Sequence, residues 1–276
     1  MSLARPPAIA FFAAVLGAVV STGVAFAVAP SSVIAQLNAQ RSKNGIPAVV
    51  ENKGWSSACA AHNKYLKRTR DFAHPEQKGK PGYTKQGAWA GLNSVLSIGA
   101  TWANGNPWED APLHLMQVLT PQLRSIGIDD GAGFSCATTF PGYRLGAKNA
   151  VYSYPGDRTT GWRRSETARE GPYTAGEAVG LRQGTQTGLI LLVFADGPWV
   201  KRGKLKITSA SLTGPAGAVE IRTVDNYAPK VGPYMSTGGV IIPLQPLAPN
   251  ATYNAAVTLK GGAVTLKRSW SFTTGG

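Results

Sequence analysis

Histidine, cysteine and acidic residues are scarce in this chain. It has 3 histidines, 2 cysteines and 14 acidic residues among 276. It also lacks an H-E-x-x-H motif, a cysteine cluster, a Gly-rich phosphate-binding loop and a G-x-S-x-G motif. These absences exclude the zinc proteases, cysteine-cluster zinc proteins, P-loop nucleotide-binding proteins and serine hydrolases that those motifs define.

Long apolar runs are absent after residue 29, so we expect no membrane helix there. Before that point, Arg5 precedes an apolar run over residues 8–20, and A-x-A cleavage triplets occur within residues 25–29. This pattern predicts a secretory signal peptide over residues 1–29. A retained anchor is the alternative, because about 20 apolar residues are just enough to span a bilayer. Either way, we expect a protein that is secreted or associated with the cell envelope.

Basic residues outnumber acidic residues 28 to 14, giving a net charge of +14. The charges are scattered, with small clusters only at residues 163–164 and 201–204. Proteins that bind nucleic acids usually concentrate basic residues and interleave them with aromatic residues, so no nucleic-acid partner is predicted. An anionic envelope polymer or lipid headgroups are plausible partners, and a merely basic surface remains the other interpretation.

Cys59 and Cys136 form an even pair in a chain that we expect to be exported. In an oxidising compartment this favours one disulfide. Two free buried thiols are the alternative.

Residues 30–157 are predicted to form one α+β layered domain, because helix signals are followed by signals for a small sheet. The predicted helices cover residues 31–42, 54–70, 88–101 and 112–120, and the predicted strands cover residues 125–128, 134–140 and 150–154. The second helix has apolar residues at the spacing i, i+3, i+4, i+7. His62 lies on this apolar side and is interpreted as a core histidine.

Residues 186–276 contain short strand signals separated by turn residues, a pattern typical of a β-sandwich. The closing segments at 246–253 and 269–274 resemble bacterial immunoglobulin-like or fibronectin-III-like modules. The segment 158–185, rich in Gly and Arg, is interpreted as a connection between the two domains.

A series of short motifs surrounds His74 and His114. They are His-Pro-Glu at 74–76, Pro-Gly-Tyr-Thr at 81–84 with Gly87, Trp-Glu-Asp-Ala-Pro-Leu-His at 108–114, Thr-Pro at 120–121, Ile-Gly at 126–127 and Tyr-Ser-Tyr-Pro-Gly at 152–156. In order and spacing they resemble the bacterial branch of the CAP superfamily (cysteine-rich secretory, antigen 5 and pathogenesis-related 1 proteins; SCP-like). The resemblance covers about residues 31–157.

This resemblance implies a three-layer α-β-α sandwich with an open cleft. In the family, two histidines and two glutamates converge in the cleft, which binds a divalent metal in some members. His74 and His114 match the two histidines. Ala88 and Ala111 stand where the family has glutamates.

Glu76, Glu109 and Asp110 lie near the matched positions in sequence and are candidate replacements for the missing carboxylates. Two imidazoles alone are too few for a closed zinc site, which takes four ligands. Two interpretations stay open: His74 and His114 share a divalent metal such as zinc, or each caps a loop or helix through hydrogen bonds.

The leading hypothesis is a secreted, non-enzymatic binding or scaffold protein at the cell envelope. Its ligand would be an anionic envelope polymer or a small hydrophobic molecule. A divergent metal-dependent envelope hydrolase and an adhesion protein using the immunoglobulin-like module are the alternatives. The candidate cleft residues are His74, His114, Trp108, Glu76 and Glu109.

Overall fold

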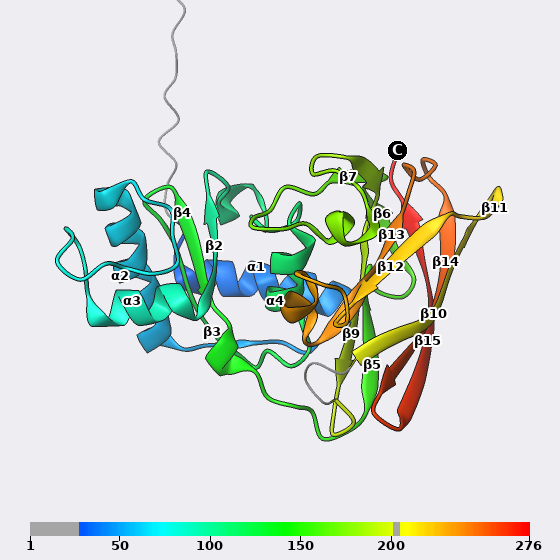
Figure 1. The fold of residues 1–276 in the computed structure, drawn as a ribbon, viewed down its shortest axis with the longest axis horizontal. Coiled ribbons are helices and arrows are strands. Elements are labelled where there is room, and N and C mark those ends of the chain that lie inside the picture. Colours follow the sequence, from blue (N-terminus) through cyan, green and yellow to red (C-terminus); the bar gives the residue numbers. More distant parts are fainter. Residues whose placement is uncertain (1–27, 201–204) are drawn as a thin grey trace, which may run out of the picture.

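The computed structural model describes residues 28–200 and 205–276. All but the last two residues of the predicted signal peptide, and the basic cluster at 201–204, lie outside these residues. Figure 1 shows the described chain as an elongated molecule, with the helices and a small sheet at one end and two larger sheets at the other. No helix in the described part is long and apolar enough to span a bilayer.

The N-terminal part is built on a four-stranded sheet in the order β1-β3-β4-β2. Its strands are β1 (Val50–Glu51), β2 (Ser94–Ile98), β3 (Ser125–Gly131) and β4 (Phe134–Thr138). β4 pairs antiparallel with both β3 and β2, while β1 runs parallel to β3. β3 and β4 confirm the strands that the sequence predicted at 125–128 and 134–140.

Helices cover both faces of this sheet. They are α1 (Pro30–Lys43), α2 (Lys53–Thr69), α3 (Lys85–Leu92) and α4 (Pro112–Leu119). On one face, Gly127 of β3 lies so close to Trp55 of α2 that a Cβ there would sit 2.2 Å from the Trp55 Cβ. Successive strand residues point to opposite faces, so Ile126 and Ile128 face the other side, where they share a core with Leu37 of α1.

α2 forms where the sequence predicts it because its signals agree. The side chain of Asn52 caps the helix by accepting a hydrogen bond from the Trp55 N–H. Its buried face carries Cys59, His62 and Leu66, so the prediction of a buried helix face with a core histidine is confirmed. α1 and α4 likewise confirm the first and fourth predicted helices within a few residues.

The third predicted helix, over residues 88–101, is wrong in its extent. The helix α3 begins earlier, at Lys85, because the Thr84 side chain accepts a hydrogen bond from the Gly87 N–H. It ends at Leu92, and residues 94–98 form strand β2 instead. An apolar run of this length fits a helix or a buried strand equally well, and pairing with β4 decides for the strand.

The C-terminal part contains two larger sheets, in the orders β12-β13-β9-β5 and β11-β10-β14-β15-β6. The strands are β5 (Ala150–Tyr154), β6 (Thr159–Trp162), β9 (Leu191–Asp196), β10 (Leu205–Gly214), β11 (Gly217–Ala218), β12 (Ile221–Asp225), β13 (Gly238–Pro243), β14 (Thr252–Gly261) and β15 (Val264–Thr274). Burial alternates along β14, as expected for a sheet with one face in a core. Arg268 of β15 reaches across to β5, donating hydrogen bonds to the Ser153 hydroxyl and the Val151 carbonyl.

Strands β5 and β6 differ from the expected organisation. The sequence placed residues 150–154 at the end of the N-terminal domain, but β5 pairs with β9 in a C-terminal sheet. β6 pairs with β15, and the small sheet of β7 (Ser165–Thr167) and β8 (Gln186–Gly188) follows. The segment 158–185 is therefore structured over much of its length, and the expected boundary at 157 falls between two strands of the C-terminal sheets.

One continuous hydrophobic core joins the two parts. At the junction, Tyr154 packs edge-on against Trp162 with ring centroids 4.9 Å apart, and the Lys43 ammonium lies 4.3 Å from the Trp162 ring centroid. The Gly156 N–H donates to the Asn44 side chain at 2.6 Å. α1 is thus held directly against the segment that leads into the C-terminal part.

Candidate functional site

His114 lies in the first turn of α4, where Glu170 from a distant segment covers the helix N-terminus. The Glu170 carboxylate accepts hydrogen bonds from the backbone N–H groups of Leu113 and His114 at 3.0 and 3.2 Å. It also accepts one from the His114 Nδ1–H at 2.9 Å. The Glu170 side chain is only 1% exposed. The carboxylate therefore satisfies free helix N–H groups and fixes the orientation of the imidazole.

A groove of about 330 Å³ lies beside this pair. Its lining residues are Phe72, Leu96, Ser97, Ile98, Pro107, Trp108, Ala111, His114, Arg169, Glu170, Gly171 and Gln183. One wall belongs to the N-terminal part and the other to residues 169–183. With Nδ1 donating to Glu170, a neutral His114 ring has its unshared electron pair on Nε2.

The lining of the groove combines an apolar wall with one cation. Phe72 and Ile98 are 45% and 57% exposed, and Phe72 stacks on Phe134 with centroids 6.2 Å apart. Trp108 is buried, and its indole N–H donates to the Leu96 carbonyl at 3.1 Å, so it supports the wall from behind. Arg169 is exposed and forms no ion pair with a described carboxylate.

The structure pairs Glu76 with His62 rather than with His74. The His62 Nδ1 and Glu76 Oε1 atoms are 3.0 Å apart, and both side chains are fully buried. The second Glu76 oxygen accepts a hydrogen bond from the Thr84 N–H at 3.0 Å. Burial lowers the pKa of His62, because it disfavours the charged imidazolium. The Glu76 carboxylate favours the imidazolium and opposes this shift. This pair fastens the loop after α2 to that helix.

His74 lies near this pair but makes its own contact, from Nδ1 to the Gly91 carbonyl at 2.8 Å. It is exposed and is not among the residues that line the groove. Gly91 is required here, because a Cβ would lie 2.1 Å from the His74 carbonyl and 2.5 Å from the His62 ring.

His74 and His114 each use Nδ1 in a hydrogen bond within the protein, which leaves one ring nitrogen each. In the two described ranges, no group of three or more His, Cys, Asp or Glu side chains could hold a metal ion. A catalytic zinc site takes three protein ligands and a structural site takes four. The donors present do not fit a metal site, and the function proposed for the groove uses none.

Glu109 and Asp110 belong to a polar network at the junction of the two parts. Arg163 forms ion pairs with Asp110 and Glu166, at 2.7 and 2.9 Å. Glu109 accepts a hydrogen bond from the Gln40 side chain at 2.9 Å, and burial raises its pKa. Neither carboxylate lines the groove. The network connects the loop before α4 to the segment after β6.

Glu166 gives this network a pH dependence. Burial raises its pKa from an ordinary value of 4.5 to about 7, while Arg163 opposes the rise. Between pH 4.5 and about pH 7, Glu166 is protonated in the folded protein and ionised in the unfolded chain. The stability that Glu166 contributes therefore falls as the pH rises through this range. We expect the stability of the wild type relative to Glu166→Gln to fall by roughly 3 kcal/mol from pH 4.5 to pH 8. Urea denaturation across this range measures it, and parallel pH profiles would contradict the assignment.

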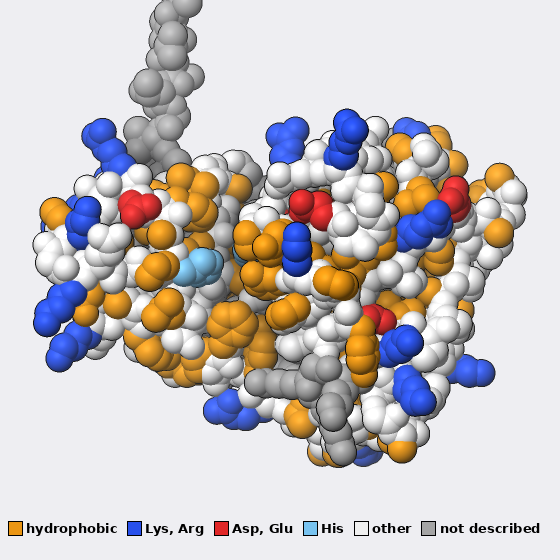
Figure 2. All heavy atoms as spheres, viewed as in Figure 1, with side chains coloured by type: hydrophobic (Ala, Val, Ile, Leu, Met, Phe, Trp, Pro, Cys, Tyr) orange, Lys and Arg blue, Asp and Glu red, His pale blue; other side chains and the backbone are white. Residues whose placement is uncertain are grey.

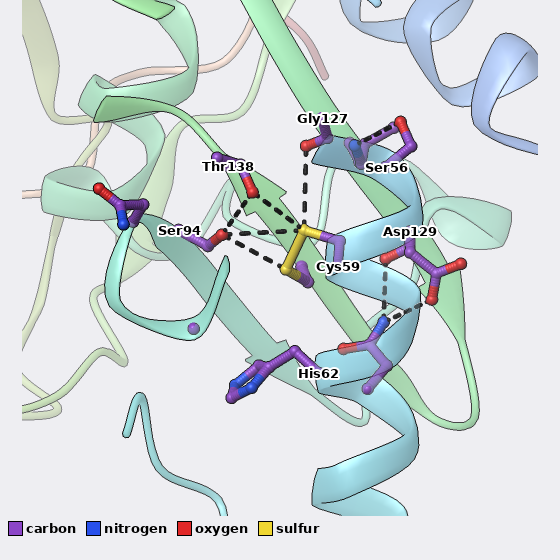
Figure 3. The surroundings of a disulfide bond; sticks show 12 residues. Ser56, Cys59, His62, Ser94, Gly127, Asp129 and Thr138 are labelled. Carbon is purple, nitrogen blue, oxygen red and sulfur yellow. Dashed lines mark hydrogen bonds between the residues drawn. A yellow bond between two sulfur atoms is a disulfide. The ribbon is translucent and has the colours of Figure 1, made fainter. Parts of the chain in front are cut away.

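Figure 3 shows the predicted disulfide in place between α2 and β4, with His62 one turn further along the helix. Cys59 and Cys136 are both fully buried. The Thr138 hydroxyl lies 3.4 Å from the Cys59 sulfur and the Ser94 hydroxyl lies 3.4 Å from the Cys136 sulfur. The disulfide fastens the helix that carries His62 to the sheet.

Sequence reasoning missed Glu170, which is 56 residues away from His114 in the chain. It lies in the segment interpreted as a connection, and no local pattern links it to α4. The Ala111 position, where the CAP family has a glutamate, was the one signal. The resemblance suggested that a carboxylate is absent there and gave no indication of Glu170.

Residues 34–131 match the sequence model of a family described as "CAP: Cysteine-rich secretory protein family". The match supports a CAP domain. It spans α1 through β3, with His62, His74 and His114, and it ends well before Glu170. No curated protein matches the chain. The carboxylate beside His114 therefore comes from outside the residues that match the family.

Proposed function

We propose that this is a secreted or envelope-associated CAP-domain protein that binds a small amphipathic anion in the groove beside His114. In this proposal it acts as a binding protein rather than as an enzyme. The observation that carries the proposal is an exposed apolar wall in one groove with an oriented histidine and Arg169, which forms no ion pair with a carboxylate of residues 28–200 or 205–276.

The chemistry of the lining selects the ligand. The Phe72 and Ile98 side chains favour an apolar body, since removing them from water is favourable. The Arg169 guanidinium favours a carboxylate or phosphate, because its fork of N–H donors matches two oxygens. The volume of about 330 Å³ is at the lower end for small-molecule sites, which favours a short chain or a single ring.

The C-terminal part has a defined role in this proposal. It supplies Arg169 and Glu170, so it completes the groove as well as extending the molecule. The expected immunoglobulin-like character of residues 186–276 and the three-layer CAP sandwich remain parts of the proposal. They are supported by the two C-terminal sheets and by helices on both faces of the N-terminal sheet.

A hydrolase is the second candidate, because the His114–Glu170 hydrogen bond is the geometry that orients an imidazole as a general base. It predicts turnover of an ester bound in the groove. The binding proposal predicts affinity without turnover.

Isothermal titration of the whole protein with dodecanoate tests the binding proposal. We expect Arg169→Gln to weaken binding about tenfold, since a charge-assisted hydrogen bond is lost. Arg182→Gln is the matched control, as Arg182 is exposed on the same segment but does not line the groove. Equal effects of the two variants, or no binding by the wild type, would contradict the proposal. Turnover of p-nitrophenyl dodecanoate that Glu170→Gln abolishes would instead favour the hydrolase.

A further inference from the structure

A second surface, which shares no residue with the groove lining, exposes large apolar side chains. We call it the aromatic surface and define it by Trp55, Trp89, Leu92 and Phe140. Trp89, Leu92 and Phe140 are 38%, 61% and 46% exposed, and Trp55 is half-buried. Contiguous exposed apolar patches are unusual on soluble monomers and mark interaction sites.

Local contacts bring these residues together from three elements. The rings of Trp55 and Trp89 are tilted against each other with centroids 6.1 Å apart. Leu92 follows Trp89 by three residues, so both lie on one face of α3. The Phe140 N–H points to the carbonyl of Asn93, directly after α3, at 3.4 Å.

Figure 2 shows hydrophobic side chains gathered over α3 and the sheet end beside it, with basic side chains at the left and lower margins. Three exposed cations lie within four residues of members of the aromatic surface in the sequence: Lys53, Lys85 and Arg144. Lys85 precedes Trp89 by one helical turn, and Arg144 donates to the Pro141 carbonyl beside Phe140.

None of these three cations forms an ion pair with a described carboxylate. The one carboxylate nearby in sequence, Glu51, accepts a hydrogen bond from the Ser56 hydroxyl. The rim is therefore net positive, and it complements an anionic surface.

The tryptophans distinguish a bilayer from an apolar protein partner. The indole N–H groups of Trp55 and Trp89 have no acceptor among the described residues. A dry protein interface would leave two buried donors unpaired, which is costly. The lipid headgroup region offers carbonyl and phosphate acceptors beside apolar chains, and tryptophan concentrates there for that reason.

We propose that the aromatic surface docks the protein on an anionic lipid bilayer, with the indole rings and Leu92 at the headgroup boundary and the three cations on the lipid phosphates. The contact is peripheral and reversible, because one short helix face and two neighbouring rings bury little apolar area. This inference does not depend on the ligand proposed for the groove.

Sedimentation with vesicles tests the proposal. The whole protein is mixed with vesicles of equal parts phosphatidylglycerol and phosphatidylcholine, and with vesicles of phosphatidylcholine alone. We expect stronger binding to the anionic vesicles. Trp89→Ser should lower that binding about tenfold. Lys53→Gln with Lys85→Gln should lower it about fivefold per residue at low salt.

Matched controls separate the aromatic surface from general stickiness. Tyr227 is 60% exposed in the C-terminal part, so Tyr227→Ser removes an exposed ring elsewhere. Lys206→Gln with Lys260→Gln removes two exposed lysines of neighbouring strands. All forms must have the same N-terminus by mass spectrometry, so that any binding through residues 8–20 is common to them.

The proposal is supported if the control variants bind anionic vesicles as the wild type does, while Trp89→Ser and the Lys53→Gln/Lys85→Gln variant bind more weakly. Equal loss in the controls, or no preference for anionic vesicles, overturns it. Analytical ultracentrifugation tests whether a second copy of the chain occupies the surface instead. If the wild type does not bind vesicles but forms a dimer that Trp89→Ser dissociates, the aromatic surface mediates self-association.

Discussion

Replacement of Arg41 by methionine should lower the free energy of unfolding by about 3–5 kcal/mol. The Arg41 side chain is fully buried in α1 and donates five hydrogen bonds to backbone carbonyls. These carbonyls belong to Pro47, Val118, Thr120 and Leu123. Methionine fills the space but leaves all four carbonyls without this donor, and a buried unpaired acceptor is costly.

Burial lowers the pKa of Arg41 to about 9, so the guanidinium is still charged at neutral pH. It lies where α4 ends, and a cation is favourable near the carbonyls at a helix C-terminus. Arg41→Lys should restore only part of the lost stability, because a single ammonium cannot donate to all four carbonyls that the guanidinium reaches. Urea denaturation measures the effect, with Arg182→Met as the control at an exposed arginine. A loss below about 1 kcal/mol would show that water replaces the guanidinium.

Loss of the Cys59–Cys136 disulfide should cost about 4–5 kcal/mol if its effect is entropic, because it closes a loop across 77 positions of the chain. The double variant Cys59→Ala/Cys136→Ala removes the bond and leaves small apolar side chains in a buried site. Thermal denaturation with and without reductant measures the effect. The wild type should lose stability in reductant, while the double variant should not respond.

Because the bond joins α2 to the sheet, its loss should also loosen the His62–Glu76 pair. Hydrogen exchange at the Thr84 amide, which donates to Glu76, reports on that pair. Unchanged protection at Thr84 in the reduced protein would show that the loop is held without the disulfide.

Local signals in the sequence were sufficient where several agreed. α2 has a strong apolar period, so it was predicted almost to its ends, while its capping residue, Asn52, was identified only in the structure. The disulfide was predicted from an even cysteine count in a chain expected to be exported, and the structure contains it. The run at 94–98 had an apolar pattern without a decisive period, and only its pairing with β4 makes it a strand.

The pairings that build the site were beyond the sequence because they depend on long-range contacts. Glu76 was a candidate carboxylate, but the structure gives it to His62, which had been interpreted only as a core residue. Glu170 was not considered, since nothing near it in the chain indicates that it covers α4. Trp108 was placed in the cleft by resemblance, and Glu109 was a candidate because it lies near a matched position in sequence. Trp108 does support the groove wall, while Glu109 faces the Arg163 network.

Strands β5 and β6 lie on either side of the expected boundary, and each completes a C-terminal sheet. A polypeptide ending at residue 157 would retain β5 with no strand to pair with, and its complement would lose the edge of one sheet. Neither half is therefore a self-contained domain when the chain is divided at residue 157. A cut at residue 157 would disrupt sheet pairing in both pieces.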